Sequence, residues 1–262
     1  MRHPGRRSDA ETSGSGYRCG WQRFDRRPPD GLSLFRLRPP NPGWRLRGLV
    51  PDEGQRNAGE LECLSLGYLC LIRHSQPEIV PGVPASEWKL SEEGRQRCKS
   101  MAKIVTAYAP DTVVTSQEPK AFETGKIIAE QLQIPVSCEE NLHEHERSRV
   151  PYQSRNEFTT AVKRFFKHPD LLIFGDETAE RACSRFDEAV GKVLREYTGN
   201  SVIVAHGTVI SLFAARYSHL DAFSLWSRLG MPSMLSFSLP GMGLVQIVDN
   251  VETGPCSPAI EV

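Results

Sequence analysis

Short apolar runs alternate with helix-like segments between about residues 65 and 250, and this alternation constrains the fold more than any other feature. The β-prone run from Tyr68 to Ile72 lies between Gly67 and Pro77, which is typical of a buried strand in a parallel sheet. Parallel strands need long crossover connections, which are usually helices. The pattern therefore predicts a single three-layer α/β domain, in which helices cover both faces of a mainly parallel sheet.

Several helices and the last two strands carry local signals for their ends. Ser91 and Asp176 are expected N-caps, and Pro119 is expected in the first turn of a helix. The apolar runs on either side of Pro240 and Gly241 predict a C-terminal hairpin. In chain order we expect strands at 68–72, 111–116, 134–140 and 201–206, helices at 92–109, 119–133, 155–168, 176–198 and 208–217, and the hairpin at 234–249.

The first 60 residues differ in composition from the rest of the chain. They contain twelve arginines, no lysine and seven carboxylates, with too little periodic apolar content to offset the entropy of ordering them. We predict a disordered Arg/Pro/Gly-rich arm over 1–64, one folded domain over 65–250 and a flexible tail over 251–262. The pattern leaves open whether the arm has a function, while its acids and prolines disfavour a mitochondrial transit peptide.

Whole-chain composition excludes several classes of protein. Lys plus Arg and Asp plus Glu each number 32, and no window reaches the roughly 20 apolar residues of a membrane span, so we expect neither a nucleic-acid nor a membrane partner. The seven cysteines are scattered without a C-x-x-C pair, which indicates free thiols in a reducing compartment and predicts a cytoplasmic location. The chain lacks a cysteine-phosphatase loop, a G-x-S-x-G elbow, a G-x-G-x-x-G motif and a phosphate loop ending in Gly-Lys-Ser/Thr. These absences leave the histidines as the candidates for chemistry.

Two of the expected strands end in a histidine, His74 and His206. Arg73 precedes the first, and Gly207 follows the second at the expected start of a helix. Ligands of open α/β sheets bind at the carboxyl ends of the strands, and a helix N-terminus favours an anion. Lys120 stands near the start of another helix, just after a third strand end. We therefore predict that these five residues converge on a phosphate-binding pocket.

Five short motifs, over roughly residues 65–250, resemble those of the histidine phosphatase superfamily, whose fold is also called phosphoglycerate-mutase-like. The family's Arg-His-Gly motif is matched by "RHS", its S-S-P-L-x-R-A-x-Q-T segment by "TSQEPKAFET" and its L-x-E by "LHE". Its G-E-S helix start is matched by "GDET" and its V-x-H-G strand end by "VAHG". Each motif is weak alone, but five in the family's order make the resemblance specific.

The resemblance implies a role for each residue of the predicted pocket. His74 resembles the nucleophile, which takes the phosphoryl group onto a ring nitrogen. Glu144 resembles the acid that protonates the leaving oxygen and later activates water. The resemblance thus implies a metal-independent phosphomonoesterase that acts on a small phosphorylated substrate without a cofactor. The catalytic residues it implies are His74, Glu144 and His206, and the phosphate-binding residues are Arg73, Lys120, His206 and Gly207.

Two positions depart from the family's pattern. Ser75 stands where the family has glycine after the nucleophile, and Lys120 stands where it has a second arginine. Lysine keeps the positive charge but loses the planar fork of a guanidinium. Glu118, where the family often has leucine, could orient Lys120 or select a cationic substrate group. The simplest interpretation of Glu118 is a solvated loop charge.

The run from His143 to Glu146 resembles a set of metal ligands, but no further partner is evident in the sequence and we expect no metal. Glu146 is a rival to Glu144 as the acid. The alternatives to a phosphatase are a phosphoglycerate mutase, a non-catalytic module that binds phosphorylated ligands, and an interaction protein acting through the arm. The segment between Glu144 and Tyr152 does not resemble the mutases' substrate-gripping insertion. Neither the natural substrate nor the oligomeric state follows from the sequence.

Overall fold

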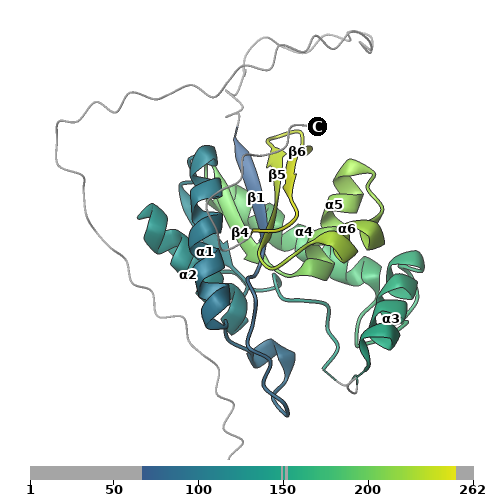
Figure 1. The fold of residues 1–262 in the computed structure, drawn as a ribbon. Helices are drawn as coiled ribbons and strands as arrows, with labels where there is room; N and C mark the ends of the chain where they lie inside the picture. The colour runs from purple at the N-terminus through teal and green to yellow at the C-terminus, as the bar shows by residue number, and fades with distance from the viewer. Residues whose placement is uncertain (1–66, 149, 151–152, 252–262) are drawn as a thin grey trace, which may run out of the picture.

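The computed structural model describes residues 67–148, 150 and 153–251. The predicted arm at 1–64 and all of the predicted tail except Val251 lie outside these residues. The described residues form one six-stranded sheet with helices on both faces, in the strand order β3-β2-β4-β1-β5-β6 (Figure 1). The predicted three-layer α/β fold is therefore confirmed.

The four strands at one side of the sheet run parallel. β1 (Tyr68–Arg73) pairs with β4 (Ser201–Ala205), which pairs with β2 (Thr112–Thr115), which pairs with β3 (Val136–Cys138). Because these strands are parallel, their carboxyl ends lie at one edge of the sheet. The residues that follow β1, β2 and β4 are therefore brought to the same edge.

The remaining two strands form the predicted C-terminal hairpin. β5 (Ser233–Ser238) pairs antiparallel with β1, and β6 (Gly243–Val248) pairs antiparallel with β5. The turn between them spans residues 239–242 and includes Pro240 and Gly241, as expected. The hairpin makes the sheet mixed, although β1 and β4, which end at the two histidines, pair with each other in parallel.

Two helices cover one face of the sheet. α1 (Glu92–Val105) begins after Ser91, whose side chain accepts a hydrogen bond from the Gly94 N–H, as predicted. α2 (Pro119–Leu132) begins with the predicted proline. Alternate residues of β1 point to this face, and their side chains pack with the helices into one buried cluster: Cys70, Ile72, Met101, Ala102, Val105, Ala121, Ile128 and Ala129.

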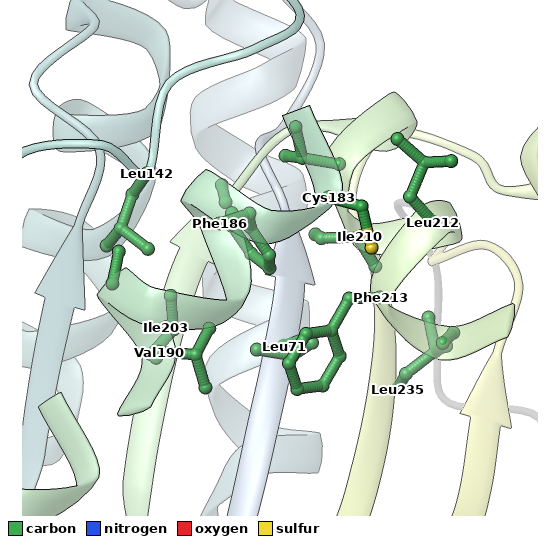
Figure 2. Packing of buried hydrophobic residues seen from close by; sticks show 14 of the residues in the cluster. Leu71, Leu142, Cys183, Phe186, Val190, Ile203, Ile210, Leu212, Phe213 and Leu235 are labelled. Carbon is green, nitrogen blue, oxygen red and sulfur yellow. The ribbon is translucent and has the colours of Figure 1, made fainter. Parts of the chain in front are cut away.

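The other face is covered mainly by α4 (Ala179–Glu196) and α5 (Gly207–Ser218). Phe213 lies at the centre of the cluster in Figure 2, with ring centroids 5.8 Å from Phe186 and 5.7 Å from Phe237. Buried aromatic rings at such edge-to-face distances hold helices against a sheet. The cluster also contains Leu71, Ile203 and Leu235 from the strands and Leu142 from the loop after β3.

α3 (Arg155–Lys167) and α6 (Ala222–Arg228) lie beside this second layer, with Phe166 of α3 near Trp226 of α6 (Figure 1). The sequence did not predict α6, a short helix whose N-cap Asp221 accepts from the Ser224 N–H. Among the described residues, no helix has the length and apolar character needed to span a membrane.

The predicted N-cap of α4 is wrong by two residues. Thr178, not Asp176, is the N-cap, and its side chain accepts from the Arg181 N–H. The Asp176 backbone N–H instead donates to the Glu146 carbonyl at 2.7 Å. Asp176 is therefore part of a loop contact before the helix. Thr178 instead accepts a hydrogen bond from the otherwise free N–H of Arg181, three residues later.

Candidate active site

The two strand-end histidines lie side by side at the carboxyl edge of the sheet. His74 follows β1, and His206 follows β4 as the N-cap of α5. β1 and β4 are adjacent, with Arg73 paired to Ala205, and the two imidazole centroids are 5.2 Å apart. His206 is fully buried and His74 is 6% exposed. The predicted convergence of these two residues is therefore observed.

The His74 ring is held in one tautomer by its own backbone. Its Nδ1 lies 2.8 Å from the Ser75 carbonyl oxygen, which can only accept a hydrogen bond, so Nδ1 carries the proton and Nε2 keeps a lone pair. Burial lowers the pKa of His74 well below its usual value, and His206, Lys120 and Arg73 lower it further. His74 is therefore a neutral imidazole with an unprotonated Nε2.

The Ser75 side chain points toward α1. Its hydroxyl donates to the Gly94 carbonyl of α1 at 2.7 Å, and its backbone N–H donates to Thr124 Oγ1 of α2 at 3.0 Å. The side chain is completely buried. The backbone that orients His74 is therefore tied to α2 through the Ser75 N–H and to α1 through the Ser75 hydroxyl.

Arg73 lies against the start of α5. Its Nη1 donates to the Leu229 carbonyl, while its buried Nε has no hydrogen-bond partner among the described residues. A Cβ atom on Gly207 would be 3.0 Å from that Nε, so the close approach of the guanidinium to the helix needs a glycine. A cation beside a helix N-terminus is an arrangement that favours a bound anion.

His206 has one ring nitrogen engaged and one without a partner. Nε2 lies 2.9 Å from Ser116 Oγ, and the buried Nδ1 has no partner among the described residues. Burial lowers the pKa of His206 well below its usual value, with Lys120 as the next cause. When the Ser116 hydroxyl donates to Nε2, Nδ1 carries the proton and can donate to an anion.

Lys120 lies in the same cluster, and its ammonium group is bound to a carbonyl oxygen and to a carboxylate. Its ammonium donates to the Ala85 carbonyl at 2.7 Å and forms an ion pair with Glu118. Glu118 Oε1 accepts from the Glu144 N–H at 3.1 Å and lies 3.4 Å from His206 Nε2. The Glu118 side chain is 14% exposed, so its interpretation as a solvated loop charge is wrong.

Glu144 lies at the N-terminus of α5. Its Oε2 accepts from the Thr208 N–H at 3.3 Å and its Oε1 from the His145 N–H at 2.9 Å. Burial is the largest single influence and raises the pKa of Glu144, but His206, Arg147 and the His145 N–H together hold it below its usual value. An ionised carboxylate thus lies at the anion-favouring N-terminal end of α5.

The other residues of the His143–Glu146 run point elsewhere. The Glu146 carboxylate contacts His143 at 3.2 Å with about half of its side chain exposed, and it contacts neither strand-end histidine. The His145 ring is buried against Phe165, with the centroids 4.2 Å apart. Within the described ranges, no group of three or more His, Cys, Asp and Glu side chains is arranged to hold a metal ion.

Two features of this site were missed by the sequence analysis. One is the central position of Glu118, because a loop residue before a helix gives no signal of its side-chain direction. The other is an ion pair between Glu177 and Arg185, which lies behind the loop that carries Glu144. The "GDET" motif marks the first member of the pair, but no pattern marks its partner eight residues later.

The cluster brings together a neutral imidazole, two cations, a helix N-terminus and a carboxylate at the carboxyl edge of the sheet. The family model of the histidine phosphatase superfamily (branch 1) matches residues 69–238. This match covers more than half of the chain, which therefore belongs to the histidine phosphatase superfamily.

A curated relative and several solved structures are similar to this chain. The chain is 24% identical over 166 residues, covering 58% of this chain and 78% of the relative, to PhoE of Bacillus subtilis (strain 168), described as an uncharacterized phosphatase. YhfR of Bacillus stearothermophilus is similar with a TM-score of 0.56 and 22% identity, over 71% of this chain and 98% of that one.

Two further solved structures have names that state a substrate. A mycobacterial glucosyl-3-phosphoglycerate phosphatase complexed with VO3 has a TM-score of 0.56 and 18% identity, over 72% of this chain and 100% of that one. A mutant phosphoserine phosphatase of Entamoeba histolytica in complex with phosphoserine has a TM-score of 0.56 and 17% identity, over 70% of this chain and 96% of that one. At these identities the structural likeness shows a shared fold.

Proposed function

We propose that this protein is a phosphomonoesterase that works through a phosphohistidine formed on His74. The observation that carries this proposal is the hydrogen bond from His74 Nδ1 to the Ser75 carbonyl, which leaves the Nε2 lone pair available. A neutral imidazole is nucleophilic near pH 7, and the lowered pKa of His74 keeps it neutral there. The phosphatase names of its relatives support the hydrolytic assignment.

In the first step, the Nε2 lone pair attacks phosphorus and the bond from phosphorus to the leaving oxygen breaks. Arg73, His206 and the start of α5 at Gly207 hold the phosphoryl oxygens and stabilise their charge. Glu144 gives its proton to the leaving oxygen. In the second step, Glu144 takes a proton from water, the water oxygen bonds to phosphorus, and the bond to Nε2 breaks to release phosphate.

The role of Glu144 requires its pKa to rise when substrate binds. The pKa of Glu144 is lowered in the site without a ligand, where its carboxylate accepts N–H bonds from Thr208 and His145. A phosphoryl dianion that binds at the helix N-terminus places like charge beside the carboxylate and competes for those donors. Both effects raise the pKa of Glu144 and favour the protonated acid.

We propose a small phosphorylated metabolite as the substrate, since the names of two structural relatives refer to phosphoserine and glucosyl-3-phosphoglycerate. The steps above are carried out by this chain's own side chains, and we propose that they need no metal or other cofactor. We also keep the cytoplasm as the proposed location. A mutase would pass the phosphoryl group to a sugar acid rather than to water, so release of inorganic phosphate separates the two activities.

The proposal is tested by following turnover of p-nitrophenyl phosphate by the wild type and by His74→Ala, with and without a chelator. We expect His74→Ala to remove turnover while the circular dichroism spectrum stays unchanged, and the chelator to have no effect. A folded His74→Ala variant that retains the wild-type rate would contradict the nucleophile assignment. Binding of phosphate without any turnover by the wild type would instead support the non-catalytic alternative.

A further inference from the structure

The loop that carries Glu144 is held by an ion pair from α4 and the segment before it. We propose that Glu177 and Arg185 are a positioning pair that orients the Glu144 carboxylate toward the leaving oxygen. This inference rests on the proposed role of Glu144 as general acid. It assigns a function to one residue of the "GDET" motif and to an arginine that no motif marks.

Arg185 binds the main chain of the loop at three points. Its Nη1 donates to the carbonyl oxygens of Asn141 at 2.8 Å and His143 at 3.1 Å. Its Nη2 donates to the carbonyl oxygen of Glu144 itself at 3.2 Å. The Arg185 side chain is only 14% exposed. The guanidinium of Arg185 is nearly buried and donates to three carbonyl oxygens. It therefore fixes the direction of the backbone that leads up to Glu144.

Glu177 binds the Arg185 guanidinium and also the backbone that follows Glu144. Its Oε1 accepts from Arg185 Nη2 at 2.6 Å and its Oε2 lies 3.3 Å from Arg185 Nε, which is a two-point contact. The same Oε1 accepts from the Glu146 N–H at 3.0 Å. The backbone is thus anchored at Glu144 and two residues later, so the Cα–Cβ bond of Glu144 has a set direction.

Two further contacts bring the same segment against the loop. The Asp176 N–H donates to the Glu146 carbonyl at 2.7 Å, and His145 Nε2 lies 3.3 Å from the Glu177 carbonyl. Gly175 has a φ of +88°, and a Cβ there would be 2.3 Å from the Glu146 oxygen. Only glycine adopts this conformation readily at such a close approach. The segment 175–177 is therefore shaped to fit the loop of the general acid.

Positioning has a different kinetic signature from general stability. A general acid speeds departure of a poor leaving group by about 10²–10⁴-fold but matters little for a good one. The leaving group of phenyl phosphate has a pKa of about 10, and p-nitrophenyl phosphate has a better leaving group. A small displacement of Glu144 should therefore slow the hydrolysis of phenyl phosphate much more than that of p-nitrophenyl phosphate. A loss that is only structural lowers both rates equally.

The experiment measures kcat and KM for both aryl phosphates in Arg185→Met, Arg185→Lys and Glu177→Gln, beside Glu144→Gln. We expect Arg185→Met to lower kcat for phenyl phosphate about 10- to 100-fold and for p-nitrophenyl phosphate less than about 3-fold, with KM nearly unchanged. Arg185→Lys should recover part of the loss, because an ammonium still donates to carbonyls but lacks the fork. If Arg185→Met does not fold, Arg185→Lys and Glu177→Gln provide the same comparison.

Arg216→Met is the matched control, since the Arg216–Asp187 ion pair joins α5 to the same helix α4. It should leave the ratio of the two rates unchanged. Equal losses on both substrates in the Arg185 and Glu177 variants would overturn the inference while leaving the phosphatase intact. If Glu144→Gln itself shows no preference for the better leaving group, the proposed role of Glu144 fails, and the positioning role fails with it.

Discussion

At the scale of single residues, the ion pair between Lys120 and Glu118 lies at the centre of the candidate site. Lys120 carries a positive charge, but a nearly buried carboxylate neutralises it and also contacts the Glu144 N–H. An incoming phosphoryl group must compete with Glu118 for the ammonium. The pair therefore weakens the attraction of the ligand-free pocket for anions.

We predict that Glu118→Gln strengthens inhibition by inorganic phosphate about 10-fold, or about 1.4 kcal/mol, because one negative charge leaves the pocket. Lys120→Ala should lower kcat/KM about 10²-fold or more, since it removes a cation and leaves Glu118 without its partner. The double variant, Glu118→Gln with Lys120→Ala, should show a smaller loss in kcat/KM than Lys120→Ala alone. Phosphate inhibition that is unchanged in Glu118→Gln would show that Glu118 does not compete with the ligand.

A second prediction at this scale concerns the protonation of the two histidines. Both pKa values are lowered by burial, so both rings stay neutral below pH 6.5 in the folded protein. The unfolded chain takes up protons near pH 6.5, so stability falls as the pH drops from 6.5 toward the lowered values. Titration of the imidazole signals by NMR, assigned with His74→Ala, should give midpoints below 6.5. A midpoint at or above 6.5 for His74 would contradict its assignment as a neutral nucleophile.

At the scale of elements, apolar runs ending in His74 and His206 were sufficient to place both residues at one edge of the sheet. This prediction depends only on the two strands being parallel, which the alternation of strands and helices along the chain favours. The start of α4 at Thr178, the helix α6 and the direction of the Glu118 side chain could not be predicted. They depend on contacts with residues far along the chain, which a local pattern does not contain.

The contact between Arg73 and the start of α5 can be tested by adding one methyl group. Gly207→Ala would place a Cβ 3.0 Å from Arg73 Nε and 3.1 Å from Cζ, so the guanidinium must move. We predict a loss in kcat/KM of about 10- to 100-fold with little change in Tm. Gly191→Ala in α4 is the control, because its Cβ would meet only the flexible end of Arg195 at 3.2 Å. Equal activity of Gly207→Ala and the wild type would show that Arg73 need not lie against α5.

At the scale of the whole molecule, the sheet, its buried clusters and the candidate site all lie within the described part of the chain. Both buried clusters, the six strands and every residue proposed to bind the phosphoryl group lie between residues 67 and 251. We therefore predict that the proposed chemistry does not need the arm. Deleting residues 1–60 should leave kcat/KM for p-nitrophenyl phosphate and the Tm nearly unchanged. A fall of several degrees in Tm would show that the arm packs on the domain.

The central claim is that His74 carries the phosphoryl group between substrate and water. The most direct measurement is rapid quenching of the wild type with phosphorylated substrate, followed by mass spectrometry of the peptide that contains His74. We predict a phosphate label on Nε2 of His74 that is stable in base and lost in acid, and that is absent from His74→Ala. Steady turnover by the wild type with no label on His74, or with a label on another residue, would contradict the account.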